Sequence, residues 1–311
     1  IDGNVPTISS VSSTKANGGY TVGDTIPITI TFTQTVTIKV GNTAVEPLPG
    51  TDGSPYIYLP QIPRDVFYTS GSGTNILRFD YIIAAGQNSS DLSYTTTNKL
   101  AIWGTGGSIQ DASGNDASLT LPTSGDSGSL SANKNIIIDT TGPTVSTVSS
   151  TKADAAYKVG ESIPINVNFD EKVYVTGTPQ LTLETGTTDA VVDYASGSGT
   201  DTLTFNYTVA STHNSSDLDY TSTTALGLNS GTVKDSLGNV ATLTLPAPGA
   251  TGSLGANKTI IIDNLPPDII FNPIDGSTAV LPTSIIWIAF SEHVRLTDNT
   301  EVTNDNVDAL I

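Results

Sequence analysis

The sequence predicts an all-β chain built from tandem β-sandwich modules, and three observations support this prediction. β-Branched residues, together with Ser, Thr, Gly and Asn, are abundant in the 311 residues, whereas stretches of helix-forming residues are missing. Apolar and polar residues alternate with a period of two, as expected of a strand with one buried face. Long segments of the sequence also occur twice, which indicates a repeated structural unit.

The repeat predicts the domain organisation. Residues 1–23 align with residues 138–160 at an offset of 137, with 14 identical positions out of 23. Residues 68–74 align with residues 194–200 at an offset of 126, so the first copy has 137 − 126 = 11 extra residues. We expect two complete modules, 1–138 and 139–263, followed at 264–311 by the N-terminal part of a third module of a different subfamily. Insertions belong in surface loops, so the proline-rich and aromatic stretch 46–63 is expected to protrude.

The second copy has the clearest strand pattern. Within 162–169, Ile163, Ile165, Val167 and Phe169 face one way and the residues between them the other, and 26–32 repeats this pattern in the first copy. Further strands are predicted at 173–175, 180–184, 190–194, 203–209, 232–234, 241–245 and 259–262. Seven or more short strands with frequent turns in about 125 residues are typical of an immunoglobulin-like β-sandwich.

A characteristic stretch separates the modules. An isoleucine-rich strand is followed by Asp139 and then Pro143, and the same order recurs with Asp263 and Pro266. Proline is incompatible with a helix interior and keeps the residue before it extended, so this stretch predicts a short, stiff linker. Modules joined by such linkers would form an extended rod.

Composition excludes several function classes. Thirty acidic residues against 12 basic ones give a formal charge of −18, which argues against a nucleic-acid partner. No run approaches the roughly 20 apolar residues of a membrane span. Cysteine is absent, so core burial and metal binding, rather than disulfides, are expected to provide stability. The chain begins in mid-pattern without methionine, and we expect it to be a segment of a longer polypeptide.

Several motifs resemble a known family. They are Ile-Asp-Thr-Thr-Gly-Pro-Thr, Phe-x-Glu-x-Val, Ser-Gly-Ser-Gly-Thr-x-Thr-Leu-x-Phe-x-Tyr-x-Val and Asp-x-x-Gly-Asn. Together they resemble the bacterial immunoglobulin-like tandem repeats of large surface proteins and adhesins, over residues 1–263. The stretch 290–296 is similar to the immunoglobulin-like domain of S-layer-type surface proteins. The resemblance implies an extracellular or bacterial cell-surface location, extended rods, and often calcium at the junctions.

Acidic residues at the junction between the modules form a candidate calcium site. The N-terminus of an immunoglobulin sandwich lies at the same pole as the loops after the second and sixth strands. Asp139 is therefore expected near Asp170 and Glu171, which follow the second strand, and near Asp235 and Asn239 in a hairpin. Calcium prefers six to eight hard oxygen ligands, which these side chains offer. The alternative is that the same Asp and Asn residues only form turns through bonds to their own backbone.

Equivalent sites are predicted at the other two module ends. The candidate ligands at the end of the second module are Asp263, Asp154, Glu161 and Glu292, which takes the position of Glu171. At the start of the chain the candidates are Asp2, Asp111 and Asn115. There Thr33 and Gln34 replace the Asp-Glu pair, which weakens the site.

The sequence contains no recognisable catalytic constellation, and an enzyme is not expected. The two histidines, His213 and His293, lie in different modules, and no phosphate loop, zinc spacing or nucleophile elbow occurs. We expect a structural stalk or adhesive segment of a giant secreted or cell-surface bacterial protein. Its partners would be neighbouring modules, with a glycan or protein ligand bound elsewhere in the parent protein.

Two alternatives remain open. The first is a subunit of a self-assembling extracellular filament or S-layer-like structure, in which identical chains would be the partners. The second is a carbohydrate-binding accessory region of a secreted hydrolase. In that case the aromatic residues Tyr56, Tyr58, Phe67 and Trp103 of the first module would contact the sugar.

Overall fold

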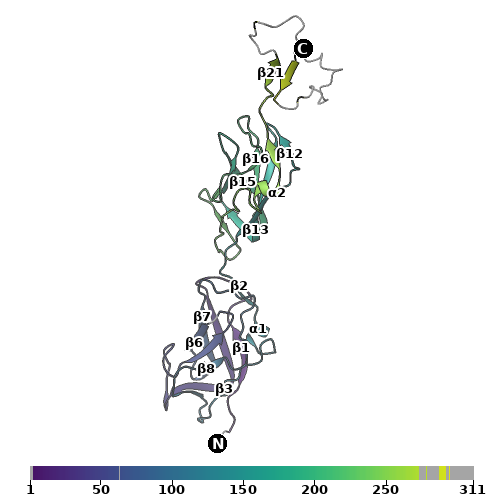
Figure 1. Ribbon diagram of the computed structural model, residues 1–311. Coiled ribbons are helices and arrows are strands. Elements are labelled where there is room, and N and C mark those ends of the chain that lie inside the picture. The colour runs from purple at the N-terminus through teal and green to yellow at the C-terminus, as the bar shows by residue number, and fades with distance from the viewer. Residues whose placement is uncertain (1–2, 63, 273–277, 279–286, 292–293, 295–311) are drawn as a thin grey trace.

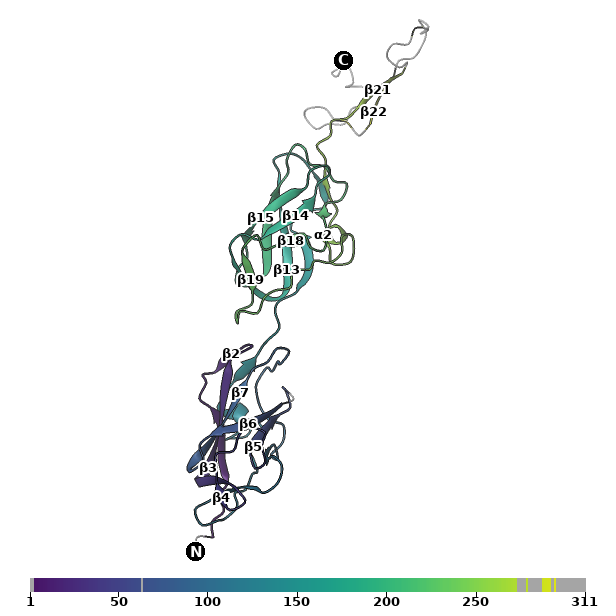
Figure 2. The ribbon, with the colours of Figure 1, turned by 90° about the vertical axis from the view of Figure 1, so that its left-hand side faces the viewer.

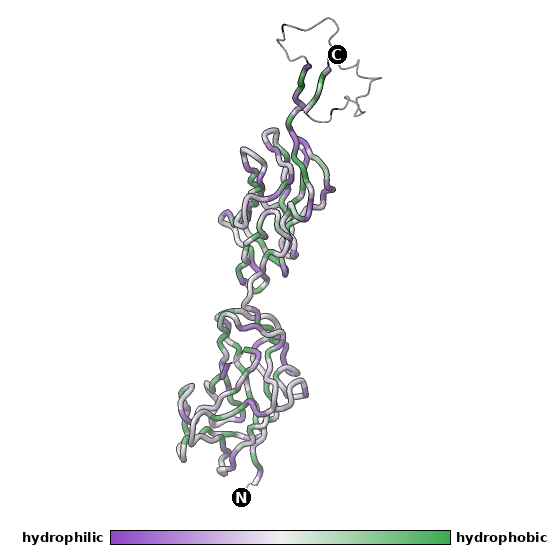
Figure 3. Tube along the Cα trace, viewed as in Figure 1, coloured by the Kyte–Doolittle hydropathy of each residue, from purple (hydrophilic) through white to green (hydrophobic). Residues whose placement is uncertain are grey.

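The computed structural model describes residues 3–62, 64–272, 278, 287–291 and 294. Two β-rich modules and a short hairpin follow one another in a row (Figures 1 and 2). Hydrophobic and hydrophilic residues are interleaved along the strands of both modules (Figure 3). No helix of the described residues is long and apolar enough to cross a membrane.

The first module extends from β1 to β10. Its elements are β1 (Ile8–Ser13), β2 (Gly18–Tyr20), β3 (Thr25–Val40), β4 (Thr43–Ala44), β5 (Pro55–Leu59), β6 (Arg64–Ser70), β7 (Thr74–Ile82), β8 (Leu100–Ile102), β9 (Gly107–Gln110), α1 (Leu130–Asn133) and β10 (Ile136–Ile138).

The second module extends from β11 to β20. Its elements are β11 (Val145–Ser150), β12 (Ala155–Tyr157), β13 (Ser162–Thr176), β14 (Gln180–Glu184), β15 (Ala190–Ser196), β16 (Thr200–Thr208), β17 (Asp219–Tyr220), β18 (Leu226–Gly227), β19 (Thr232–Lys234), α2 (Leu254–Asn257) and β20 (Ile260–Ile262).

The strands of each module form a curled sheet with closely similar topology. The order β1-β3-β7-β6-β5 of the first module recurs as β11-β13-β16-β15-β14 in the second, and β8 and β18 pair with β5 and β14 in the same register. β4 pairs with β3 in the first module, and β17 pairs with β14 in the second. One long strand takes part in both faces of each sandwich. The first part of β13 pairs with β11 and β16, and after a register shift between Asn168 and Val173 its end pairs with β19. β3 is shifted in the same way between Thr31 and Val36. A register shift of this kind bends the strand, so that one strand can take part in two packed sheets.

A parallel strand pair closes each module immediately before the linker. β10 pairs with β2 and β20 pairs with β12, so each isoleucine-rich strand lies beside the second strand of its own module. Ile136 and Ile138 are buried, as are Ile260 and Ile262. Because burying one such side chain contributes about 1.5–3 kcal/mol, the end of each module is firmly anchored.

Buried apolar residues of the described part of the chain gather in two clusters, one in each module. In the second module the alternating residues Ile163, Ile165 and Val167 have no exposed surface, and Phe169 is 5% exposed. The predicted all-β fold with immunoglobulin-like sandwiches is confirmed, and a period-two pattern is the reason that it was predictable.

Three details differ from the sequence-based expectation. The segments 162–169 and 173–175 form one strand, β13, rather than two strands with a loop between them. Residues 241–245 form no ladder, because the backbone N–H groups of Ala241, Thr242 and Leu245 donate to three different segments. Each module also has one short helix, α1 or α2, which is capped by Ser129 or Ser253.

The inserted stretch of the first module is only partly a surface loop. β5 lies within 46–63, yet it pairs with β6 and β8, and Ile57 and Leu59 have no exposed surface. The expectation that all of this stretch protrudes was therefore wrong. The register of β5 matches that of β14, so the extra residues lie before β5, where Leu48 is 72% exposed.

The third predicted module falls largely outside the described residues. The structure describes β21 (Ile269–Asn272) and β22 (Trp287–Phe290), which form an antiparallel pair. β22 coincides with the apolar stretch that predicts a strand at this position.

Candidate metal site at the junction of the two modules

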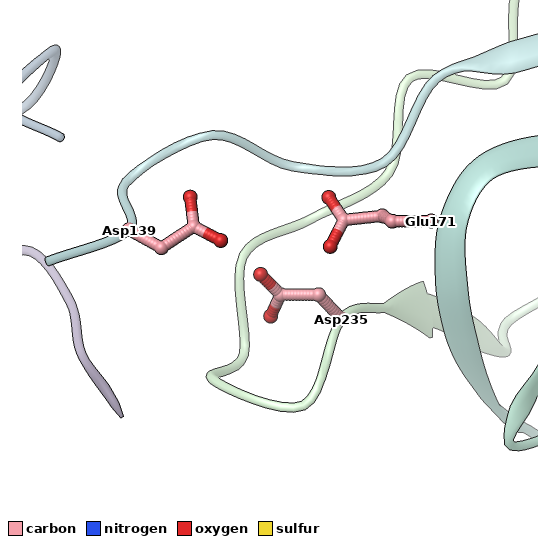
Figure 4. Close-up of side chains that lie close together, drawn as sticks. All are labelled: Asp139, Glu171 and Asp235. Carbon is pink, nitrogen blue, oxygen red and sulfur yellow. The ribbon is translucent and has the colours of Figure 1, made fainter. Parts of the chain in front are cut away.

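Three carboxylates from three separate segments converge where the linker meets the second module. Asp139 follows β10, Glu171 belongs to β13, and Asp235 follows β19. One carboxylate oxygen of each lies within 4.8 Å of the other two. Figure 4 shows the three side chains pointing toward one another. Asp235 is buried, whereas Asp139 and Glu171 are half-buried.

The loop after β19 holds Asp235 in place. Its Oδ1 atom accepts hydrogen bonds of 2.8 Å from the backbone N–H groups of Leu237 and Asn239, and its Oδ2 atom accepts one of 2.6 Å from Asn239 Nδ2. Asp111 accepts bonds from Ser113 and Asn115 in the same way in the first module. The turn-forming role is therefore present in both modules. A carboxylate has about four lone-pair sites, so Asp235 keeps acceptor capacity for a cation.

Glu171 and Asp170 lie at the register shift inside β13. The two Asp170 oxygens accept hydrogen bonds from the backbone N–H and the hydroxyl of Thr144, at 2.8 and 2.6 Å. Asp170 thus binds the linker directly, and Glu171 is the neighbour that joins the carboxylate group. At the equivalent place in the first module, Thr33 Oγ1 accepts a hydrogen bond of 3.1 Å from the backbone N–H of Thr7.

The carboxylates are close enough to perturb one another. Burial raises the pKa of Glu171, and the negative charges of Asp139, Asp235 and Asp170 raise this pKa further. Burial also disfavours ionised Asp170, but the hydrogen bonds from Thr144 outweigh it and lower the pKa of that carboxyl. The ion pairs among the described residues are Arg78–Asp80 and Lys258–Asp154, so no basic side chain neutralises the three converging carboxylates.

This donor set fits a calcium ion. Oxygens on opposite sides of calcium, each at about 2.3–2.6 Å from it, lie up to roughly 5 Å apart. The separation of the three oxygens, at most 4.8 Å, is compatible with that geometry. A hard dication would also relieve the mutual repulsion of the carboxylates. These residues would supply part of the six to eight ligands, and water and backbone oxygens commonly supply the rest.

Asn239 connects both modules and the linker. Its Nδ2 atom donates to the carbonyl of Asp139 at 3.1 Å, and its Oδ1 atom accepts a bond of 2.6 Å from the hydroxyl of Thr21 in the first module. Leu237 packs on Gly19, where a Cβ atom would lie 2.9 Å from its methyl carbon. Asn239 was predicted to lie at this junction, but Thr21, Gly19 and Leu237 were not. The one sequence signal is that Gly19 aligns with Ala156 in the second module.

Hydrogen bonds also fix the linker to the first module. The Asn88 Oδ1 atom accepts a bond of 2.7 Å from the backbone N–H of Thr140, and Asn88 Nδ2 donates to the hydroxyl of Thr141 at 2.8 Å. The backbone N–H of Asp139 donates to the carbonyl of Tyr20. The linker is therefore held on both sides without any metal.

The remaining predicted ligands make other contacts. Asp263 accepts a bond from the N–H of Leu265 at 3.2 Å, just as Asp139 accepts one from Thr141 at 3.0 Å. Glu161 accepts a bond from the N–H of Lys158 at 2.8 Å, and Asp154 lies 3.8 Å from the Lys258 ammonium. Asp2 and Glu292, which were predicted as ligands at the two outer sites, lie outside the described residues.

The chain is thus a tandem of immunoglobulin-like β-sandwich modules joined by a short linker. Two solved structures similar to it are both from titin. An I-band fragment is 10% identical, with 86% of this chain and 67% of that chain covered and a TM-score of 0.26. Titin immunoglobulin tandem domains are 8% identical, with 85% and 99% covered and a TM-score of 0.19. No family model matches this chain. No curated protein matches it either.

Proposed function

We propose that this chain is a structural stalk segment of a secreted or cell-surface bacterial protein, and that calcium stiffens the junction between its two modules. The observation that carries the proposal is the convergence of Asp139, Glu171 and Asp235 at the linker. A stalk needs modules that resist bending at their joints, and this junction is the place where a cation would act.

The division of roles follows from the positions of the three side chains. Asp139 belongs to the linker, whose backbone is bonded to the first module through Tyr20. Glu171 and Asp235 belong to the second module. One ion shared by the three carboxylates would therefore connect the linker to the second module at a further point, in addition to the bonds of Asn239 and Asp170. Bending at the junction would then require breaking metal–oxygen bonds.

Calcium titration calorimetry of the whole chain tests this proposal. We expect a calcium site in the wild type that Glu171→Gln weakens at least about ten-fold, since the amide removes one of three negative ligands, and ten-fold corresponds to about 1.4 kcal/mol. Glu184→Gln is the matched control, because Glu184 lies in the same module on β14 and is exposed. Wild-type titrations without binding heat, or equal affinities for the wild type and Glu171→Gln, would contradict a calcium site at this junction.

A further inference from the structure

Three aromatic side chains form a compact group on the outer face of the first module. Tyr56 on β5, Phe67 on β6 and Trp103 directly after β8 have ring centroids 5.6–5.9 Å apart in each pair. Their neighbours along the strands, Ile57 and Val66, point into the core. Trp103 is 42% exposed, and Tyr56 and Phe67 are half-buried. The group therefore lies on the solvent side of its sheet.

The second module shows that the fold does not require these rings. The strand registers place Gln180 where the first module has Tyr56, and Asp193 where it has Phe67. Gln180 donates a hydrogen bond of 2.8 Å to Asp193 across the same strand pair. Two copies of one sandwich thus carry an aromatic group in one case and a polar pair in the other. Exposed aromatic rings that the fold does not require are typical of a binding surface.

A pocket and the inserted loop adjoin the aromatic group. The pocket has a volume of about 400 Å³ and is lined by residues of β6, including Phe67, by residues of β7, and by Pro49 of the inserted loop. A Cβ atom at Gly50 would contact the Phe67 ring at 3.8 Å, so the loop lies against this ring. The volume falls within the range of small-molecule sites, about 300–1,000 Å³.

The polar groups of the pocket indicate the chemistry of its occupant. Asp65, Thr69 and Asp80 line it together with Arg64, and Arg78 forms an ion pair with Asp80 at 2.7 Å. Carboxylates and a hydroxyl beside apolar ring faces suit a ligand with both C–H faces and O–H groups. The chain as a whole has a formal charge of −18, which disfavours anionic ligands. A neutral carbohydrate meets both conditions.

We propose that this face of the first module, formed by Tyr56, Phe67, Trp103 and the adjoining pocket, binds a neutral polysaccharide or oligosaccharide. The sugar ring would stack on Trp103, and its hydroxyl groups would bond the carboxylates of the pocket. This activity is independent of the calcium site, because the two lie in different modules. A stalk segment with such a face would itself contact glycan through its first module.

Binding of the whole chain to immobilised neutral oligosaccharides tests the inference. The neutral probes are cellohexaose, chitohexaose, xylohexaose and maltohexaose, and heparin is the anionic comparison. We expect retention on at least one neutral probe and a loss of affinity of at least about ten-fold in Trp103→Asn, which corresponds to about 1.4 kcal/mol. Tyr174→Ala removes a ring of similar exposure, 44%, from the second module and is expected to leave the affinity unchanged.

A second variant guards against a folding defect. The double substitution Tyr56→Gln and Phe67→Asp introduces the residues of the second module and is expected to abolish retention while the thermal unfolding of the chain stays cooperative. Retention on no neutral probe would overturn the inference. It would also be overturned by binding to heparin alone, or by equal affinity of the wild type, Trp103→Asn and the double variant.

Discussion

Single residues at equivalent positions of the two modules often fill one role with different chemistry. In the first module Gln87 Oε1 accepts hydrogen bonds from the hydroxyl of Tyr81 and the N–H of Ala84, both at 2.8 Å. In the second module His213 Nδ1 lies 3.0 Å from the hydroxyl of Tyr207 and accepts a bond of 3.2 Å from the N–H of Ala210. Each pair satisfies a tyrosine hydroxyl in the core, which is costly to leave without a partner.

This equivalence predicts the effect of two substitutions. His213→Gln should change the free energy of unfolding by less than about 0.5 kcal/mol, because glutamine already fills this place in the first module. His213→Leu should cost about 1–3 kcal/mol, because the Tyr207 hydroxyl loses its acceptor. Urea denaturation of both variants measures the difference. Equal losses in the two variants would show that the histidine ring itself is required.

Residues that meet across the junction were the hardest to predict. Asp139, Glu171 and Asp235 were predicted to converge because their positions follow from the order of strands in a sandwich. The contact of Leu237 with Gly19 depends on how two separate modules are oriented, and strand periodicity within a module carries no information on that. Aspartates in turns, such as Asp111, also have the same local pattern whether or not a cation is nearby.

At the scale of elements, the strands with alternating residues were predictable and the ends of strands were not. The alignment offset between the two copies changes between residues 38 and 68. The alignment alone does not locate the extra residues within that stretch. Prolines at both ends of β5 suggested a loop. Pro55 is the first residue of its strand, a place where the missing N–H is tolerated.

The role of β5 as a core strand gives a prediction with an internal control. Ile57→Ala should destabilise the first module by about 2–5 kcal/mol, since it removes a fully buried side chain. Leu48→Ala in the inserted loop should be nearly neutral, because Leu48 is 72% exposed. Chemical denaturation followed by tyrosine fluorescence distinguishes the two. A neutral Ile57→Ala would mean that β5 contributes nothing to the core.

At the scale of the whole molecule, each module has its own core and its own buried tyrosines. Burial raises the pKa of Tyr81, Tyr94 and Tyr207 to about 12 from a usual value of 10.0. Between pH 10 and about pH 12, the folded state therefore keeps tyrosine hydroxyl protons that the unfolded state releases. Stability is full below pH 10 and falls as the pH rises toward 12, by up to about 1.4 kcal/mol per pH unit for each tyrosine.

Alkaline titration checks this expectation in both modules. Tyrosinate absorbance should show that the buried tyrosines Tyr81, Tyr94 and Tyr207 ionise only together with unfolding. Tyr94→Phe should shift the unfolding of the first module to higher pH and leave that of the second module unchanged. Ionisation of all tyrosines in one step near pH 10, while the fold persists, would contradict the burial described above.

The stiffness of the junction is the central property of the proposed stalk, and small-angle scattering of the whole chain measures it most directly. In millimolar calcium the wild type should have a narrow distribution of end-to-end distances, and chelator should broaden this distribution and lower the melting temperature. When the calcium concentration exceeds the Kd of the site a hundred-fold, calcium binding adds about 2.7 kcal/mol to the stability of the folded state. Glu171→Gln should behave in calcium as the wild type does in chelator. Identical scattering and melting of the wild type in calcium and in chelator would contradict the account and leave Asp139, Glu171 and Asp235 as turn and surface residues.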